Sequence, residues 1–420
     1  MKKRVVVTGL GVISPNGIGK EAFWEANLNG TSGVDYIEGL DVSDMSVKIA
    51  AQVKNFDPMA FMQEGVAKRA DRFSHFGIAA AKLAMEDSGM DTEQLDKERA
   101  GVIFASGLGG ALFHEEQMIR AIKANTVKVA PICVPKITPN AVAAQIAIQH
   151  GFLGPNYVVS TACASGNHAI GEAFRKIQHK EADVMVTGGA EAPLTLFTLS
   201  AFSALRTLSR APCPPREASR PFDLNRDGFV MGEGGAALVL EDLDHALARE
   251  APIYAEITGY GLTSGAYHMV MPVADGQDAA RTMALALKDA ALRPGYIDYI
   301  NAHGTSTRAN DLAETRAIKK VLGERAFQVP VSSTKSMIGH TIGAAGAMEA
   351  VISCLVIQNH RIPPTINYQE PDPECDLDYV PRKAREKAVR AVLSNSFGFG
   401  SVNACLIFQK YEKHRAAASS

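Results

Sequence analysis

The sequence predicts an α/β fold with buried sheets, and two observations support this prediction. Short runs of β-branched residues end in loops of Gly, Ser and Thr, and they alternate with Ala-rich stretches of helical length. Alternation of this kind is typical of strands that are covered by helices. The chain has 420 residues, of which 46% are hydrophobic, so it can bury a large core as one domain or as two fused halves.

The positions of the elements follow from these runs. We expect strands at residues 4–8, 101–105, 156–160, 184–187, 236–241, 299–302 and 389–394. We expect helices at residues 73–88, 141–150, 166–179, 278–291, 311–322 and 344–358. Two glycine-rich stretches, 9–11 and 107–110, lack the remaining residues of a dinucleotide fingerprint or a phosphate loop, so we interpret both as close-packing turns.

Two stretches of the sequence resemble each other, which indicates an internal duplication. Residues 157–161 lead into Cys163 and a small-residue helix, and residues 329–334 lead into Lys335 and a second helix of the same kind. Each helix is followed by a strand that ends in glycines. We therefore expect an N-terminal half at 1–250, a C-terminal half at 251–412 with a proline-containing insertion at about 361–387, and an unstructured tail at 413–420.

Composition excludes several classes of function. The chain carries 43 Lys and Arg against 45 Asp and Glu, a formal net charge of −2, which argues against nucleic-acid binding. Six scattered cysteines form no C-x-x-C pair, so we expect reduced thiols in the cytoplasm and no metal site. The apolar run after Lys2-Lys3-Arg4 is broken by glycines and is interpreted as a strand, and no apolar stretch approaches the ~20 residues of a membrane span.

Cys163 is the first candidate for chemistry. It lies in Ser160-Thr161-Ala162-Cys163-Ala164-Ser165-Gly166, between a strand and a helix. The start of a helix presents unpaired N–H groups, which lower the pKa of a thiol and can stabilise an oxyanion. The alternative is a buried structural cysteine, which is the usual state of a free cysteine and the favoured interpretation of the other five.

Two histidines and a lysine lie in similar loops. His303 follows a strand in Asn301-Ala302-His303-Gly304-Thr305, and Lys335 and His340 lie beside a glycine-rich helix start. Loops of this kind concentrate catalytic groups. A single histidine is usually structural, but two histidines and a lysine together with a candidate thiolate indicate a catalytic set. Glu314 and Glu349 lie about a helix turn beyond these loops and could pair with Lys335.

Four blocks of the sequence form a recognisable set: Thr161-Ala-Cys163-Ala-Ser-Gly166, Asn301-Ala-His303-Gly-Thr-Ser-Thr307, Lys335-Ser-Met-Ile-Gly-His340 and Asn395-Ser-Phe-Gly-Phe399-Gly400. They resemble the signature motifs of elongating 3-oxoacyl-acyl-carrier-protein synthases of type II. The resemblance runs from about residue 4 to residue 409. It implies a thiolase-like five-layered αβαβα fold built from two pseudo-repeated halves, a dimer, an acyl carrier protein as partner, and no redox or metal cofactor.

The resemblance also assigns roles to individual residues. Cys163 would take the acyl chain, His303 and His340 would promote decarboxylation of malonyl-carrier-protein, and Lys335 would order the histidines with Glu314 nearby. The backbone N–H groups of Cys163 and Phe399 would form the oxyanion hole, and Phe399 would act as a gate. The expected substrate contacts are Thr305, Thr307, Val270, Leu108 and Cys133, and the expected carrier-protein contacts are Lys68, Arg69, Lys128 and Arg206.

Several positions depart from the fatty-acid pattern. Arg308 stands where Pro is usual, Val270 where Thr is usual, Cys133 where Phe commonly closes the acyl pocket across the dimer, and Ser401 where Gly is usual. Residues 308–311 instead resemble the ketosynthase-α subunit of type II polyketide synthases, although residues 161–163 resemble the fatty-acid enzymes. We therefore expect a ketosynthase that is specialised for a secondary-metabolite or polyketide pathway.

Three alternatives remain open at this point. The first is a housekeeping elongation synthase. The second is a scaffold subunit similar to the Cys-less chain-length factor with which polyketide ketosynthases form heterodimers, and the intact Cys163, His303 and His340 argue against it. The third is a thiolase, which would need a second catalytic cysteine near the C-terminus; Cys405 is not in a glycine-rich loop.

Overall fold

The structure is a computed structural model that describes residues 2–413; apart from Lys413, the predicted tail lies outside the described residues. One mixed sheet runs through the molecule in the strand order β11-β10-β14-β15-β9-β1-β8-β7-β5-β6. In its middle, β1 and β9 pair over only three residues each. The sheet therefore divides into two parts of five strands.

The first part consists of β6 (Asn156–Val159), β5 (Ala100–Ala105), β7 (Val184–Glu191), β8 (Gly234–Asp242) and β1 (Val5–Ser14). The second consists of β11 (Val331–Ser332), β10 (Tyr299–Asn301), β14 (Ala391–Gly398), β15 (Val402–Gln409) and β9 (Ala255–Ser264). Each part has two parallel pairings followed by two antiparallel ones in the same order. This repeated topology confirms the predicted duplication.

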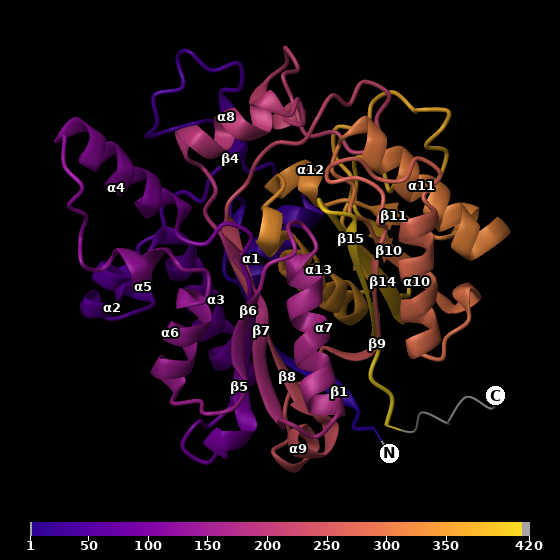
Figure 1. Ribbon diagram of the computed structural model, residues 1–420. Helices are drawn as coiled ribbons and strands as arrows, with labels where there is room; N and C mark the ends of the chain where they lie inside the picture. Colours follow the sequence, from indigo (N-terminus) through magenta and orange to yellow (C-terminus); the bar gives the residue numbers. More distant parts are fainter. Residues whose placement is uncertain (1, 414–420) are drawn as a thin grey trace.

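Five layers follow from the way the helices cover these strands (Figure 1). Helices α7 (Ser165–Gln178) and α13 (Ala345–Asn359) lie side by side in the middle and contact strands of both parts. Helices α3 (Arg72–Ser88) and α6 (Ala141–His150) cover the outer face of the first part. Helices α10 (Gln277–Asp289) and α11 (Arg308–Leu322) pack together beside the second part, with α10 directly on its strands. The predicted five-layered α/β fold is confirmed.

The remaining elements decorate this frame. The further helices are α1 (Lys20–Leu28), α2 (Glu64–Arg69), α4 (Ala111–Lys123), α5 (Cys133–Ile137), α8 (Leu196–Ala204), α9 (Leu243–Ala248) and α12 (Lys335–Ile338). The short strands are β2 (Gly17–Ile18), which pairs with β1, and the pairs β3 (Val34–Tyr36) with β4 (Ile49–Ala51) and β12 (Arg361–Ile362) with β13 (Arg385–Glu386). The expected insertion at 361–387 contains β12 and β13.

The first strand is longer than the sequence predicts. We expected it to end at residue 8 because glycines follow, but β1 continues to Ser14 with every residue buried. A Cβ on Gly9 would lie 2.1 Å from the carbonyl oxygen of Ala84, and one on Gly11 would lie 2.0 Å from that of Ala80. The glycines therefore let α3 pack directly on the strand. The close packing was predicted correctly, but the turn at this position was wrong.

Helix α13 is mostly apolar. Together with the turn before it, it forms the 18-residue stretch Ile342–Asn359, which is long and apolar enough to cross a membrane by composition alone, but 89% of that stretch is buried inside the protein. It is therefore the core helix of the middle layer. Its packing beside α7 brings the loops that precede the two helices to the same end of the molecule.

Candidate active site

A cavity of about 470 Å³ opens where loops from both halves meet. Cys163 comes from the start of α7, His303 from the end of β10, and His340 from the loop before α13. These three side chains line the cavity together with Phe399, which follows β14. The two helix-start loops that looked duplicated in the sequence thus contribute to one site.

Cys163 lies two residues before α7 and is 6% exposed. The preceding Ala162 has a φ of 50°, a left-handed conformation that is strained for a residue with a Cβ. A Cβ on Gly398 would lie 2.7 Å from the carbonyl oxygen of Thr161. The absence of that side chain lets the turn that carries Phe399 approach the cysteine loop closely.

The ionisation of Cys163 differs from the sequence-based expectation. Burial raises the pKa of the thiol to about 12, although the charge of Lys335 and the backbone N–H groups of Phe399 and Cys163 favour the thiolate. The expected lowering of the pKa was wrong because the thiol is buried, and burial outweighs the charge of Lys335 and the N–H groups. The same two N–H groups point at the sulfur, which is the arrangement that an oxyanion hole needs.

His303 is held by its backbone. Its N–H donates to Oε1 of Glu314 at 2.8 Å, and the N–H of Gly304 donates to Oε2 at 2.8 Å. Asn395 also donates to Oε1 of Glu314 at 3.0 Å. Glu314 therefore fixes the loop of His303 and is not the partner of Lys335 that we considered.

Lys335 pairs with the other glutamate. Its Nζ forms an ion pair with Oε1 of Glu349, and both side chains are 1% exposed. The same Nζ lies 3.5 Å from Nδ1 of His303. The lysine thus places a balanced positive charge beside the histidine, which favours the neutral imidazole.

His340 is oriented without using its ring nitrogens. Its backbone N–H donates to the carbonyl of Val230 at 2.7 Å, and its ring packs edge-on against Phe229 with the centroids 5.1 Å apart. Within residues 2–413, neither ring nitrogen has a hydrogen-bond partner although both are buried. Buried polar atoms are rarely left in this state, so His340 is prepared to bind a polar group that enters the cavity.

Both histidines are neutral at physiological pH. Burial, followed by the nearby charge of Lys335, holds the pKa of each imidazole well below its ordinary value. A neutral imidazole has one donor and one acceptor nitrogen. The pair can therefore donate hydrogen bonds to a developing oxyanion, or accept a proton, without carrying a fixed charge.

The mouth of the cavity contains most of the expected substrate contacts. Thr305, Thr307 and Val270 line it, together with Arg206 and Arg308. Thr307 caps α11 through its side chain, which accepts from the backbone N–H of Asn310 at 3.4 Å. The mouth is therefore formed by the start of α11, by the segment before α10 and by the end of α8.

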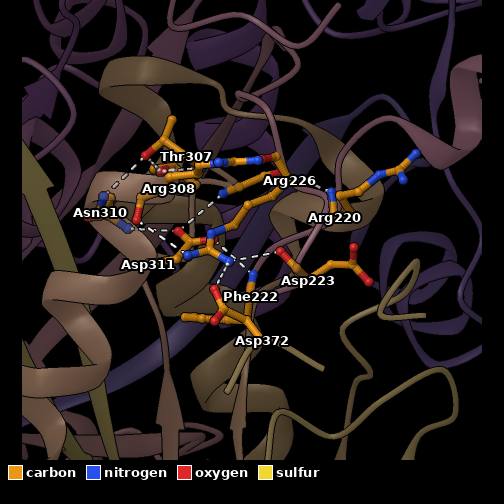
Figure 2. Close-up of polar contacts among 12 residues, drawn as sticks. Arg220, Phe222, Asp223, Arg226, Thr307, Arg308, Asn310, Asp311 and Asp372 are labelled. Atoms are coloured by element: carbon orange, nitrogen blue, oxygen red, sulfur yellow. Dashed lines mark hydrogen bonds and ion pairs between the residues drawn. The ribbon is translucent and has the colours of Figure 1, made fainter. Parts of the chain in front are cut away.

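A buried cluster of ion pairs lies behind the start of α11, at the mouth of the cavity, as Figure 2 shows. Arg226 donates to Asp372 at 2.6 Å and lies 3.5 Å from Asp311. Asp311 in turn accepts from the N–H groups of Phe222 at 2.9 Å and Ser306 at 3.2 Å. The cluster joins the loop at 219–228, the start of α11 and the insertion that contains Asp372, so the insertion helps to hold the mouth in place.

Other expected site residues lie away from the cavity of this chain. Leu108 is exposed after β5, and Cys133 is half-buried at the start of α5, where its sulfur lies 3.9 Å from Oε1 of Gln117. Lys68 and Arg69 are on α2, and Lys68 forms a surface ion pair with Glu64 at 2.5 Å. These residues and the exposed Lys128 do not line the cavity, whereas Arg206 does.

Glu191 is a buried charged residue that the sequence did not single out. Its carboxylate accepts from the N–H groups of Gly107 at 2.6 Å, Leu108 at 3.0 Å and Gly343 at 3.0 Å, and from the hydroxyl of Ser106 at 3.2 Å. It therefore joins the turn after β5 to the loop of His340. Burial raises the pKa of Glu191 to about 7.

The other cysteines lie outside the cavity. Of the cysteines, only Cys163 lines the cavity. Cys405 is buried within β15 and donates to Asn395 at 3.1 Å. Across residues 2–413, no cluster of three or more His, Cys, Asp or Glu side chains could hold a metal ion.

Comparison with known families decides the classification. The sequence model of the family's β-ketoacyl synthase N-terminal domain matches residues 2–246. The sequence model of its C-terminal domain matches residues 254–369. The chain belongs to the β-ketoacyl synthase family. The two matched ranges contain Cys163 and the pair His303 and His340, respectively.

Individual relatives and structures agree with this membership. The chain is 46% identical over 411 residues to 3-oxoacyl-[acyl-carrier-protein] synthase 2 of Synechocystis, covering 98% of this chain and 99% of that protein. It is 44% identical over 409 residues to the enzyme of the same name from Coxiella burnetii, covering 97% of this chain and 99% of that protein.

Solved ketosynthases have the same fold. A type II polyketide ketosynthase in complex with its acyl-carrier protein gives a TM-score of 0.91 at 38% identity, covering 98% of this chain and 100% of that chain. The ishigamide ketosynthase/chain length factor gives 0.93 at 36% identity, with the same coverage of 98% and 100%.

Proposed function

We propose that this ketosynthase joins a Cys163-bound acyl chain to malonyl-carrier-protein by decarboxylative Claisen condensation. The observation that carries the proposal is the cavity that Cys163, His303 and His340 line together, with both ring nitrogens of His340 buried and unpartnered within residues 2–413. A thiol beside two neutral imidazoles fits thioester exchange and enolate stabilisation.

The first half-reaction loads the enzyme. The sulfur of Cys163 attacks the carbonyl carbon of an acyl thioester, the carbonyl oxygen becomes an oxyanion, and the carrier thiol leaves. The backbone N–H groups of Cys163 and Phe399 bind that oxyanion. Because burial keeps the thiol protonated at neutral pH, its proton must leave as the sulfur attacks, and it protonates the departing carrier thiolate. A neutral imidazole that lines the same cavity is available to relay it.

The second half-reaction forms the carbon–carbon bond. The malonyl thioester loses CO2, and the electron pair of the broken bond forms an enolate whose oxygen accepts hydrogen bonds from His303 and His340. The enolate carbon then attacks the acyl carbonyl, and the thiolate of Cys163 leaves. Neutral imidazoles suit this task because they stabilise the enolate without needing a strong base.

The buried residues around the histidines act as positioning groups. Glu314 fixes the backbone of His303, and the ion pair of Lys335 with Glu349 keeps a compensated positive charge 3.5 Å from the ring of His303. We infer that the pair holds His303 neutral and correctly oriented. A buried ion pair is costly to break, so loss of either partner would disturb the histidine.

We further propose that the enzyme serves a specialised pathway for long or poly-keto chains. The support comes from Arg308 at the mouth of the cavity, from Cys133, and from the 36–38% identity to polyketide ketosynthases. The alternative is housekeeping fatty-acid elongation, which the 44–46% identity to 3-oxoacyl-carrier-protein synthases favours. The scaffold and thiolase alternatives fit poorly, because Cys163 is in place and Cys405 is outside the cavity.

The proposed partners are an acyl carrier protein and a second subunit of the same fold, in a cytoplasmic dimer. Helix α6 contacts the edge strand β6, α5 contacts α6, and α4 packs on α5. Apolar side chains are exposed along α4, α5 and the segment between them: Met118, Ile119, Ile122, Val127, Val129 and Val134. A surface of this kind is typical of an interface between subunits. The second subunit is either a copy of this chain or a Cys-less homologue.

Within the chain, we propose a division into two halves, residues 1–250 and residues 251–412.

The decisive test is condensation with defined substrates. We expect the purified protein to form an acyl adduct on Cys163 and, with malonyl-carrier-protein, to release CO2 and a 3-oxoacyl product that is two carbons longer. Mass spectrometry of the protein and of the carrier-bound product measures both steps. An acyl adduct without any CO2 release or product would contradict the proposed condensation.

A further inference from the structure

Ser401 combines a strained backbone with a hydroxyl that bridges two segments at the mouth of the cavity. Its φ is 57°, a left-handed conformation that Gly adopts without cost and that is unfavourable for Ser. Ser401 is 9% exposed and lines the cavity two residues after Phe399. A Gly here would avoid the strain, so the structure must gain something from the side chain.

The hydroxyl of Ser401 makes two contacts to one residue. It donates to the carbonyl oxygen of His268 at 2.9 Å, and it accepts from the backbone N–H of His268 at 3.3 Å. Two backbone contacts lie on either side, from the N–H of Gly400 to the carbonyl of Met269 and from the N–H of Gly265 to the carbonyl of Ser401, each at 2.7 Å. We name residues 398–401 the gate turn and residues 267–272 the mouth loop.

The mouth loop depends on these contacts. Val270, Met271 and Pro272 line the cavity, while Tyr267 and Met269 are exposed. Inside the loop, Nδ1 of His268 accepts from the N–H groups of Val270 and Met271, each at 3.0 Å. Within residues 2–413, the hydrogen bonds that tie the mouth loop to the rest of the protein end on Gly400 and Ser401.

The gate turn carries Phe399, whose ring lies at the entrance through which an acyl group would reach Cys163. The ring of Phe399 stacks on Phe202 with the centroids 6.2 Å apart, and its backbone N–H faces Cys163. A displacement of the gate turn would therefore move the ring at the entrance and the N–H beside the sulfur together. Because the mouth loop is fastened to the same turn, the two segments are mechanically connected.

We propose that Ser401 is a positioning residue whose hydroxyl latches the mouth loop onto the gate turn and so limits which acyl chains can reach Cys163. The proposal rests on the proposed function, in which Cys163 accepts acyl chains. The strain of the left-handed Ser is offset by its two hydrogen bonds to His268, since a strained residue persists only where its surroundings compensate for it. This latch, the pair of hydrogen bonds from the Ser401 hydroxyl to His268, keeps the mouth loop close to the gate turn, so wide acyl groups pass less easily. It also holds the N–H of Phe399 in place.

Two substitutions separate the strain from the latch. Ser401→Ala removes the hydroxyl and keeps the strained backbone, whereas Ser401→Gly removes both. Ser264→Ala is the matched control. Ser264 is the last residue of β9, and within residues 2–413 the hydrogen bond of its hydroxyl is from the N–H of Ala266 at 3.3 Å, not from the gate turn. Ser401→Gly also keeps the test available if the alanine variant folds poorly, because Gly adopts this φ freely.

The first measurement is amide hydrogen exchange of the full-length protein. We expect both Ser401 variants to exchange about tenfold faster in the mouth loop, the change that loss of one or two hydrogen bonds produces, while Ser264→Ala exchanges there as the parent does. Unchanged exchange in both Ser401 variants would overturn the latch.

The second measurement compares the alkylation of Cys163 by a small reagent, iodoacetamide, and by a bulky long-chain chloroacetamide. We expect the ratio of bulky to small rates to rise by about fivefold in both Ser401 variants, in line with about 1 kcal/mol per lost hydrogen bond. A general loss of stability would accelerate both reagents, so an unchanged ratio would also overturn the proposal. Neither measurement needs condensation: if the latch is found but malonyl-carrier-protein loses no CO2, the proposed function fails and the latch stands.

Discussion

The rings of His303 and His340 lie perpendicular to each other, at an interplanar angle of 86° with their centroids 5.5 Å apart. His303 follows β10, and His340 follows α12, the short helix that comes after the neighbouring parallel strand β11. Both side chains line the same cavity, next to Cys163. This arrangement suits two donors that converge on one enolate oxygen.

We expect His303→Ala and His340→Ala to keep acyl transfer and to lose decarboxylation. Each imidazole is neutral and is expected to donate to the enolate, so each loss should slow CO2 release by about 10²–10³-fold, as for one oxyanion-hole donor. Acylation of Cys163 is followed by mass spectrometry and CO2 release by a coupled assay. His179→Ala, at the far end of α7, is the control. Normal CO2 release by both single variants would contradict the enolate role.

We expect Cys163→Ala to abolish the acyl adduct, because no other cysteine among the described residues lines the cavity. Cys213→Ala is the matched control: Cys213 is half-buried, and its sulfur accepts from Arg220 at 3.1 Å. Intact-mass spectrometry after incubation with acyl-carrier-protein measures the adduct. An adduct that persists on the alanine variant, or that maps to another cysteine, would show that the nucleophile is elsewhere.

The elements of the site that sequence could predict are those encoded in short local runs. Cys163, His303, Lys335 and His340 each lie in a small-residue loop between a strand and a helix, and the structure gathers them around one cavity or directly behind it. The alternation of strands and helices gave the α/β class for the same reason, since periodicity and loop composition are local properties.

The features that sequence missed depend on contacts between distant segments. Nothing in the sequence near Glu191 indicates that its carboxylate joins residues 106–108 to Gly343. Gly343 is more than 150 residues away from Glu191 along the chain. The continuation of β1 through Gly9 depends on α3, and the raised pKa of Cys163 depends on the walls that close the cavity. Local pattern carries no information on such burial.

Glu191 should make the stability of the protein depend on pH. Its pKa is about 7 in the folded state against an ordinary 4.5, so deprotonation favours the unfolded chain. The stabilising contribution of the protonated group is complete below pH about 4.5 and is lost as the pH rises through about 7. At about 1.4 kcal/mol per pKa unit, the unfolding free energy of the parent minus that of Glu191→Gln should fall by up to about 3 kcal/mol between pH 5 and pH 8.

Urea denaturation of both proteins at several pH values measures this difference. The glutamine side chain does not titrate, so changes that arise from other groups, such as the buried histidines, affect both proteins equally and cancel. A difference that stays constant across this pH range would mean that Glu191 does not titrate in it.

Reversal of the proposed docking charges should weaken binding of the carrier protein. Carrier proteins of this kind are acidic, and Arg206 lies at the mouth of the cavity while Lys68, Arg69 and Lys128 are exposed elsewhere on the surface. Single surface pairs contribute only about 0–1 kcal/mol, so all four are changed to Glu together. We expect a KM for the carrier protein that is raised by about tenfold or more, and a parent KM that rises with salt.

The control reverses three exposed charges that do not line the cavity, Lys180, Arg293 and Lys410, and it is compared with the reversal of Lys68, Arg69 and Lys128 alone as well as with the full set. This variant changes the net charge in the same direction and should leave the KM for the carrier protein near that of the parent. Equal effects of the two sets would mean that overall charge matters and that the proposed patch has no special part in docking.

The last prediction concerns chain length and Cys133. This residue is half-buried at the start of α5 and does not line the cavity of its own chain, so any effect on the acyl pocket must come through the second subunit. If the acyl pocket extends to Cys133 across the interface, Cys133→Phe should fill that space at native packing density. At ~0.8 kcal/mol per buried CH2, each excluded carbon should lower the efficiency for long chains by about fourfold.

Product analysis with malonyl-carrier-protein, on the protein alone and with a Cys-less homologue, measures this effect. Val134→Phe is the control for added bulk in the same proposed interface, since it places the same ring one residue further along α5 on a side chain that is exposed in the single chain. The oligomeric state of each variant is checked by light scattering. We expect shorter products from Cys133→Phe and unchanged products from Val134→Phe. If the protein alone is a homodimer that elongates ordinary saturated chains, and Cys133→Phe leaves their length unchanged, the enzyme belongs to fatty-acid elongation, because neither a widened pocket nor a second type of subunit would then be needed.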